Sequence, residues 1–188
     1  MECYEAIETR RTIRRYEQKP VPREALERIA NAGRLAASAG NAQPVKFLAV
    51  ADSYLLPSVF STLAWLRAAG DPPDGERPTA YIIILGDTTV RPSYQADAAA
   101  AAQNIMLAAH NEGIGPCWIG TVDRRALART LNIPAHLEIY AVVSLGYPAE
   151  KSVAEDHPDS TAAYRSADGV LHIPKRPLAH VLRFDKWA

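Results

Sequence analysis

The pattern of apolar and polar positions predicts several helices, of which the clearest begins after Pro22. Its apolar side chains recur at i, i+3, i+4 and i+7, at Leu26, Ile29, Ala30 and Gly33. This spacing places them on one face of an amphipathic helix, and Gly40 is suited to end it. Other helices are expected at residues 3–9, 53–69, 95–111 and 124–131.

Short continuous apolar runs predict strands that are buried on both faces. The clearest is Tyr81–Leu85, a nearly continuous β-branched run. Further strands are expected at residues 45–51, within 113–120 and at 138–146, which makes about four. Residues 149–170 are polar and predict an irregular segment. Buried strands interspersed with helices indicate the α/β or α+β class, since the pattern does not fix strand directions.

Composition indicates one globular domain over residues 1–188. Hydrophobic residues make up 48% of the chain and charged residues 22%, near the average for such domains. The 21 basic and 21 acidic residues give zero formal net charge, which argues against broad binding of nucleic acid or an anionic membrane. Cys3 and Cys117 form neither a disulfide framework nor a metal-ligand pattern, so we expect a cytoplasmic compartment and no metal site.

The densest chemical signal is a short basic segment near the start of the chain. It contains Arg10, Arg11, Thr12, Arg14 and Arg15. Guanidinium groups bind phosphate in a bidentate manner, and a second basic pair, at residues 175–176, could converge on the same phosphate. A solvated basic stretch at a helix end is the alternative, and nucleic-acid binding is a weaker one because the net charge is zero.

The loop at residues 38–44 is the second signal. Its small residues leave the backbone open, and Asn41 and Gln43 add amide donors and acceptors. Such a loop can form hydrogen bonds with the edge of a heteroaromatic ring. The alternative is an ordinary helix-to-strand turn that is capped by Gly40.

Four blocks in this order resemble the nitroreductase family of flavin mononucleotide (FMN) enzymes. The first is the basic segment with a hydroxyl residue in third position, and the second is a Ser-x-x-Asn-x-Gln-Pro loop. The third is a helix followed by a glycine-rich strand, and the fourth is a closing basic-Pro-Leu sequence. In this chain the blocks lie at residues 10–14, 38–44, 97–120 and 174–178. No single block is specific, but the four together, in order, are.

The resemblance implies the α+β class, as a three-layer α-β-α sandwich with a central, mostly antiparallel sheet. It also implies an intertwined homodimer in which each FMN lies at the subunit interface and contacts both chains. The tail at about residues 178–188 carries Leu182, Phe184 and Trp187, and we expect it to wrap around the partner subunit. The alternative is a tail that folds onto its own chain.

The resemblance also implies roles for the basic residues and the loop. Arg10, Arg11, Lys175 and Arg176 would hold the phosphate and ribityl chain of FMN, and Thr12 would donate to the ring or the ribityl chain. Arg14 would lie near the pyrimidine end of the ring, where a cation stabilises the anionic reduced flavin. The remaining ring contacts would come from the loop and from backbone near the reactive ring nitrogen: Ser38, Ala39, Asn41, Gln43, Trp118, Ile119 and Gly120.

The implied activity is an oxidoreductase that uses NAD(P)H to reduce an electron-poor acceptor of nitroaromatic, quinone or enone type by a ping-pong mechanism. The flavin carries the chemistry, so no catalytic side chain is expected. The alternative is a non-redox module that binds flavin or another phosphorylated ligand as a sensor or carrier. Val45 stands where the family often has a bulky aromatic residue, and residues 63–79 are short, so the acceptor stays open.

Overall fold

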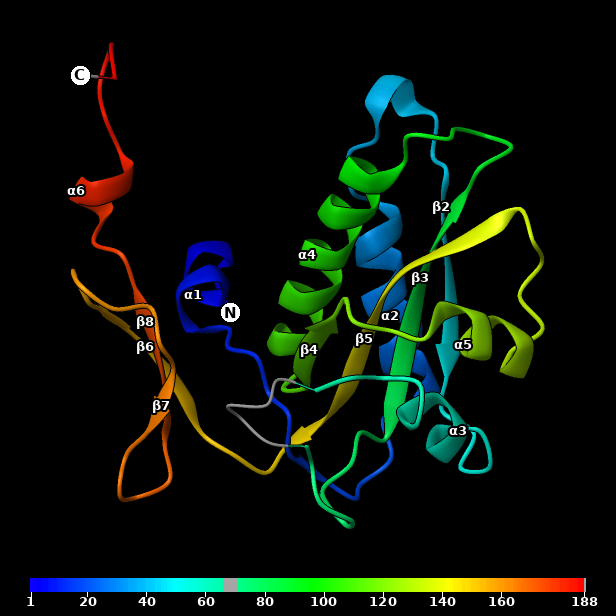
Figure 1. Cartoon of the computed structure of the whole chain (residues 1–188), viewed down its shortest axis with the longest axis horizontal. Helices are drawn as coiled ribbons and strands as arrows, with labels where there is room; N and C mark the ends of the chain where they lie inside the picture. Colours follow the sequence, from blue (N-terminus) through cyan, green and yellow to red (C-terminus); the bar gives the residue numbers. More distant parts are fainter. Residues whose placement is uncertain (66–70, 188) are drawn as a thin grey trace.

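The computed structural model describes residues 1–65 and 71–187 and centres on an antiparallel sheet (Figure 1). Its strands run in the order β1-β5-β3-β2, and β4 pairs with β5 beside β1. All of these pairs are antiparallel. The strand bounds are β1 (Tyr16–Glu17), β2 (Val45–Val50), β3 (Ala80–Asp87), β4 (Gly115–Ile119) and β5 (Leu137–Pro148).

Strand β3 contributes to the core on both faces of the sheet, as its apolar run predicts. Ile82 and Ile84 belong to one hydrophobic cluster, whereas Tyr81 and Ile83 belong to the cluster on the opposite face. Successive side chains of a strand point to opposite faces, so a continuous apolar run fills both. The prediction of a doubly buried strand is confirmed.

Helices cover both faces and complete the three layers. Helices α2 (Arg23–Arg34) and α4 (Gln95–Asn111) pack on one face, while α3 (Leu56–Phe60) and α5 (Arg124–Thr130) contribute to the core of the other. A Cβ atom on Gly33 would lie 2.8 Å from the side chain of Ile105, so glycine allows α2 to approach α4 closely. The expected three-layer α+β sandwich with an antiparallel sheet is confirmed. No helix in the described parts of the chain is both long and apolar enough to span a bilayer.

The C-terminal part of the chain forms an arm that stands beside the main body (Figure 1). In the arm, β6 (Ser152–Asp156) pairs in parallel with β8 (Leu171–Lys175), and β7 (Tyr164–Arg165) pairs with the other edge of β8. Helix α1 (Cys3–Thr9) lies between the arm and α4, and the short helix α6 (Leu178–Val181) follows β8. The prediction of an irregular segment at 149–170 is therefore wrong. Strand β6 is only partly buried and β7 is exposed, so pairing with β8, not burial, defines both strands.

The predicted helix at 53–69 is also wrong in its length. Helix α3 ends at Phe60, and beyond it the chain pairs with the segment that follows β4. Leu63 forms a β-bridge with Val122, and the Ala64 amide donates to the Thr121 carbonyl at 3.0 Å. These long-range bonds override the local helical pattern. Residues 66–69 of the prediction lie outside the described residues.

The start of β4 gives a test of how tightly the chain packs. A Cβ atom on Gly115 would lie 2.7 Å from the Cβ atom of Ile13, whereas one on Gly120 meets nothing within 4 Å. We expect Gly115→Ala to lower the free energy of unfolding by about 1–3 kcal/mol through overpacking. Gly120→Ala is the matched control and should change it by less than about 0.5 kcal/mol. Urea denaturation of the two variants measures the difference, and equal stabilities would contradict this packing.

Candidate functional site

The basic segment is held in an extended path along β4. The Ile13 amide donates to the Pro116 carbonyl at 3.0 Å, and the buried Ile13 side chain packs against Gly115. Tyr16 is fully buried, and its hydroxyl donates to the Ile13 carbonyl at 2.5 Å and contacts the Ser144 hydroxyl at 2.9 Å. Burial raises the pKa of Tyr16 well above its usual range, so this hydroxyl keeps its proton. The backbone that carries the arginines is thus fixed from both sides.

Arg10 is partly buried, and its guanidinium group has no acceptor among the described residues. Its Nη1 atom is buried and makes no hydrogen bond there. Burial, followed by repulsion from Arg11, lowers the pKa of Arg10. Buried polar groups are nearly always hydrogen-bonded, so an unpaired guanidinium N–H indicates that an acceptor from outside the chain completes the site. An anionic oxygen fits this position best.

The Arg10 and Arg11 guanidinium groups lie near His110, and the Glu5 carboxylate also acts on His110. Burial lowers the pKa of Arg11, whose guanidinium donates to the Glu8 carbonyl. The Thr9 hydroxyl lies 2.8 Å from His110 Nε2, at the last turn of α4. Burial, and then the charges of Arg10 and Arg11, lower the pKa of His110. Two guanidinium groups outweigh the Glu5 carboxylate beside a neutral imidazole, so the local charge stays positive and favours an anionic ligand.

The loop at residues 38–43 forms a short 3-10 helix, η1 (Ala39–Asn41), in a strained conformation. Gly40, Asn41 and Gln43 all have positive φ, between 53° and 61°. Asparagine tolerates this region, but it is uncommon for glutamine. The Ala39 amide donates to Asp97 Oδ1 at 3.1 Å, which ties the loop to the first turn of α4. Strained backbone that the surroundings hold in place is a feature of binding loops, so the geometry supports the loop as a ligand contact more than as a simple turn.

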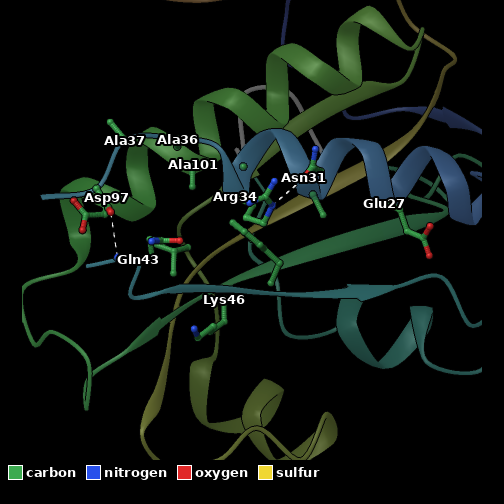
Figure 2. Close-up of a pocket in the computed structure, with 14 residues that line it drawn as sticks. Glu27, Asn31, Arg34, Ala36, Ala37, Gln43, Lys46, Asp97 and Ala101 are labelled. Carbon is green, nitrogen blue, oxygen red and sulfur yellow. Dashed lines mark hydrogen bonds between the residues drawn. The ribbon is translucent and has the colours of Figure 1, made fainter. Parts of the chain in front are cut away.

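A cavity of about 610 Å³ borders the loop between α2, β2 and the start of α4 (Figure 2). Ser38 and Gln43 line it, whereas Ala39 and Asn41 do not. Gln43 and Asp97 lie at one end of the cavity and Glu27 at the other. Asp97 Oδ2 is buried there and has no partner among the described residues. No arginine of the basic segment lines this cavity, so within one chain it is separate from the Arg10 site.

The structure places the two predicted halves of the site at opposite ends of α4. The loop contacts Asp97 in the first turn, and Thr9, which precedes Arg10, contacts His110 in the last turn. A helix rises about 1.5 Å per residue, so these two contacts are about 20 Å apart along α4. The loop and the start of the basic segment, both expected at the same flavin, are therefore separated within one chain.

The remaining predicted residues lie in β4 and in the arm. Trp118 is partly buried, with its ring 5.8 Å from that of Tyr140, and Ile119 is buried. Gly120 is exposed, and its carbonyl accepts from Arg124. Lys175 and Arg176 are exposed at the end of β8. Among the described residues, no hydrogen bond or ion pair joins this pair to the basic segment in one chain, so their convergence on one phosphate stays a prediction.

Cys117 lies in the core beside the basic segment. Its side chain is buried, as expected for a structural residue, and burial raises the pKa of its thiol to about 11. A thiol of this kind is protonated at neutral pH and is a weak nucleophile. This is the environment of a packing residue.

Three side chains that the sequence pattern did not single out organise the site. Asp97 holds the loop, His110 contacts the residue before Arg10, and Glu150 accepts from the Arg14 amide at 2.6 Å. The contacts of Asp97 and Glu150 join residues that are 58 and 136 positions apart, so no local signal points to them.

The comparisons with known proteins agree on one family. Residues 7–147 match the model of the nitroreductase family. A protein of Archaeoglobus fulgidus, provisionally named NADH dehydrogenase/NAD(P)H nitroreductase, is 34% identical over 158 residues, which cover 80% of this chain and 87% of that protein. A 5,6-dimethylbenzimidazole synthase of Rhodospirillum rubrum is 24% identical over 169 residues and is covered over 80% of its length.

A solved structure extends the match to three dimensions. It is a provisionally assigned nitroreductase of Desulfovibrio desulfuricans in complex with FMN, with a TM-score of 0.71 and 27% identity. The alignment covers 100% of this chain and 99% of that one. Together with the family model and the four sequence blocks, these matches leave one conclusion. This chain belongs to the nitroreductase family.

Proposed function

We propose that the chain is an FMN-dependent oxidoreductase that takes electrons from NAD(P)H and passes them to an electron-poor small molecule. The observation that carries the proposal is the buried Arg10 Nη1 atom, which lacks an acceptor among the described residues and lies near the Arg11 guanidinium. The FMN phosphate would supply that acceptor. The FMN complex of the Desulfovibrio desulfuricans relative supports the same choice of ligand.

The charged and polar residues of the four blocks match the chemical groups of FMN that each would contact. Arg10 and Arg11, with Lys175 and Arg176 of the arm, would neutralise the phosphate, and Thr12 would donate to the ring or the ribityl chain. Arg14 would place a positive charge at the polar edge of the ring, which stabilises the negative charge of the reduced state. When bound, FMN supplies the hydride chemistry, so the protein's part is to bind, orient and exclude water. The protonated, buried Cys117 agrees with chemistry that no side chain carries out.

We also propose that the active unit is a homodimer. The ends of α4 keep the two predicted halves of the site about 20 Å apart, so a complete site needs a second chain. The tail would offer a surface to that chain, because its Phe184 and Trp187 side chains are 80% and 75% exposed. The ribbon of the tail extends from the arm away from α3 and α5 (Figure 1). Large apolar side chains exposed together indicate a protein interface. The expectation that the tail wraps around the partner rests on this exposure.

A single open cavity would serve both substrates in turn. The nicotinamide donor would leave before an acceptor of nitroaromatic, quinone or enone type enters, which gives ping-pong kinetics. Val45 is a small residue directly after Pro44, and it lines the cavity beside Gln43. This leaves space for acceptors of different shape. A non-redox flavin-binding sensor or carrier is the alternative, and the test below separates the two.

The visible absorption spectrum of the purified protein tests the proposal directly. We expect a two-banded flavin spectrum that bleaches within the mixing time when NADH or NADPH is added without oxygen. A flavin spectrum that persists with both donors would support the non-redox alternative. A colourless protein that takes up no added FMN would contradict the proposed cofactor.

Replacement of both Arg10 and Arg11 by alanine should remove FMN and leave the fold intact. Each lost hydrogen bond from a charged group is worth about 1.5–3 kcal/mol, so the Kd for FMN should rise about 10²- to 10⁴-fold. Equilibrium dialysis measures the Kd, and urea denaturation tests the fold. Exposed Arg125 and Arg129 on α5 provide the matched double-alanine control. Full FMN occupancy in the Arg10→Ala/Arg11→Ala protein would exclude these residues as the phosphate site.

The tail is tested by Phe184→Ser together with Trp187→Ser. If these side chains bury themselves in the partner, the dimer dissociation constant should rise at least about 100-fold. Light scattering after gel filtration, over a range of protein concentrations, measures this constant. Tyr54→Ser is the control, because Tyr54 is 88% exposed on the main body. A variant that remains as dimeric as the wild type would contradict a tail that wraps around the partner.

A further inference from the structure

We propose that Glu150 is a positioning residue that holds the basic segment and the C-terminal arm in one fixed arrangement. The inference rests on the proposed function, because the proposed function assigns FMN binding to the basic residues that this carboxylate would hold in position. Arg14 lies on one side of Glu150, and the arm, which carries Lys175 and Arg176, begins on the other side. One side chain therefore joins the two groups of basic residues that are expected at the same ligand.

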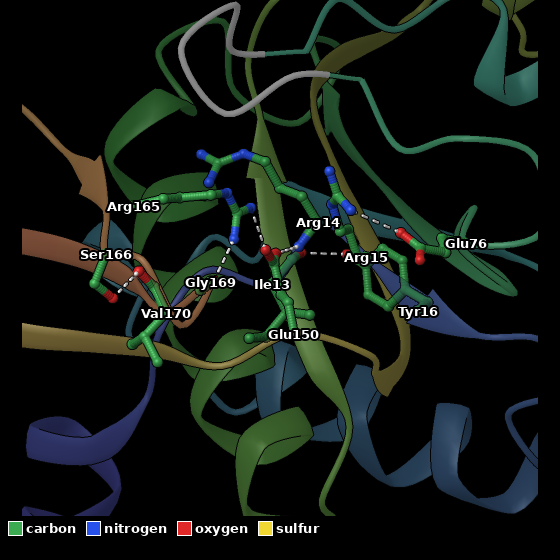
Figure 3. Close-up of polar contacts among 10 residues, drawn as sticks. All are labelled: Ile13, Arg14, Arg15, Tyr16, Glu76, Glu150, Arg165, Ser166, Gly169 and Val170. Carbon is green, nitrogen blue, oxygen red and sulfur yellow. Dashed lines mark hydrogen bonds and ion pairs between the residues drawn. The ribbon is translucent and has the colours of Figure 1, made fainter.

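The geometry around Glu150 is that of a buried tether (Figure 3). Its side chain is 3% exposed. Oε1 accepts a hydrogen bond from the Arg14 backbone amide at 2.6 Å, and Oε2 accepts one from Arg165 Nη2 at 2.6 Å. Each oxygen thus has a different partner, one in the basic segment and one in the arm. A buried carboxylate with both oxygens engaged by donors is held in one orientation.

In the arm, Arg165 links Glu150 to strands β7 and β8. Its Nη1 atom donates to the Gly169 carbonyl at 3.0 Å, across the turn that joins the two strands. Leu171, the first residue of β8, donates its amide to the Lys151 carbonyl at 2.9 Å. The β7–β8 hairpin is therefore fixed at its turn, beside Glu150. The path of β8 from this turn to Lys175 depends on that contact.

On the other side, Glu150 completes the bonding of the basic segment. The neighbouring backbone is bound by the Ile13 amide to Pro116 and by the Ala149 amide to the Arg15 carbonyl at 2.9 Å. Both of those bonds join backbone to backbone. The Arg14 amide instead donates to a side chain, the Glu150 carboxylate. A single substitution can thus remove this contact and leave the rest of the segment bound.

A second explanation of Glu150 makes the opposite prediction for ligand affinity. If the carboxylate served only to balance the charge of the arginines, its removal would make the site more positive and strengthen phosphate binding. If it positions the arginines, its removal should weaken phosphate binding even though the site gains positive charge. Glu76 provides the comparison, because its carboxylate lies 3.3 Å from Arg15 Nη1 but contacts neither Arg14 nor the arm side chains (Figure 3).

The first experiment measures the Kd for FMN in Glu150→Gln and Glu76→Gln by equilibrium dialysis. An amide can accept from one donor only, and it presents its NH₂ group to the other. We expect Glu150→Gln to raise the Kd at least about tenfold, and Glu76→Gln to leave it unchanged or lower it. A Glu150→Gln protein that binds FMN as tightly as the wild type, or more tightly, would overturn the proposal.

The second experiment measures amide hydrogen exchange in the purified proteins and does not depend on FMN. Glu150→Gln should speed exchange both at the Arg14 amide and over residues 164–175. Arg165→Gln should speed it over 164–175 while Arg14 stays protected, and Glu76→Gln should alter neither region. Arg165 is partly exposed, so we expect Arg165→Gln to fold even if Glu150→Gln does not, and it can then test the tether alone. Unchanged exchange over 164–175 in Arg165→Gln would overturn the tether. If the wild type binds no FMN, the proposed function fails while exchange still decides the tether.

Discussion

Strand β5 is the element on which the rest of this structure depends. Along one edge it pairs with β3, and along the other it pairs with β4 and β1. These pairs place the basic segment, because Ile13 is bonded to β4 and Tyr16 pairs with Pro148 at the end of β5. Glu150 follows two residues after the end of β5, and the arm begins just beyond it. The positions of the sheet, the basic segment and the start of the arm therefore all depend on β5.

Helix α4 sets the second constraint, which is one of distance. It is a single uninterrupted helix of 17 residues, and its alanine-rich face lets α2 and the sheet pack closely against it. The loop is bound to its first turn and the arginine end to its last. Because α4 separates the loop from the arginines, the two groups cannot contact the same ligand within one chain. Assembly with a second chain is the simplest way for this architecture to form a complete site.

Much of the fold can be predicted from the local sequence pattern, because the periodicity of these segments agrees with their burial in the structure. The apolar run at 81–85 and the helix at 95–111 satisfy periodicity and burial together, and the structure has both. Strands β6 and β7 escape the pattern because pairing partners, and not apolar faces, define them. Family blocks located the predicted site residues in the chain, but they did not reveal that the two groups lie at opposite ends of α4. Asp97 and Glu150 carry no local signal, since each acts on backbone far away in sequence.

The contact between Arg14 and Glu150 also affects how the chain is made. The two residues are 136 positions apart, so the basic segment leaves the ribosome long before the strand that fixes it. Until then, the apolar β3 has its neighbour β2 but not β5, and one edge of a doubly apolar strand stays open. Such an edge is prone to pair with other chains. Completion of β5 covers this edge of β3, and the chain that follows β5 brings Glu150 to the Arg14 amide.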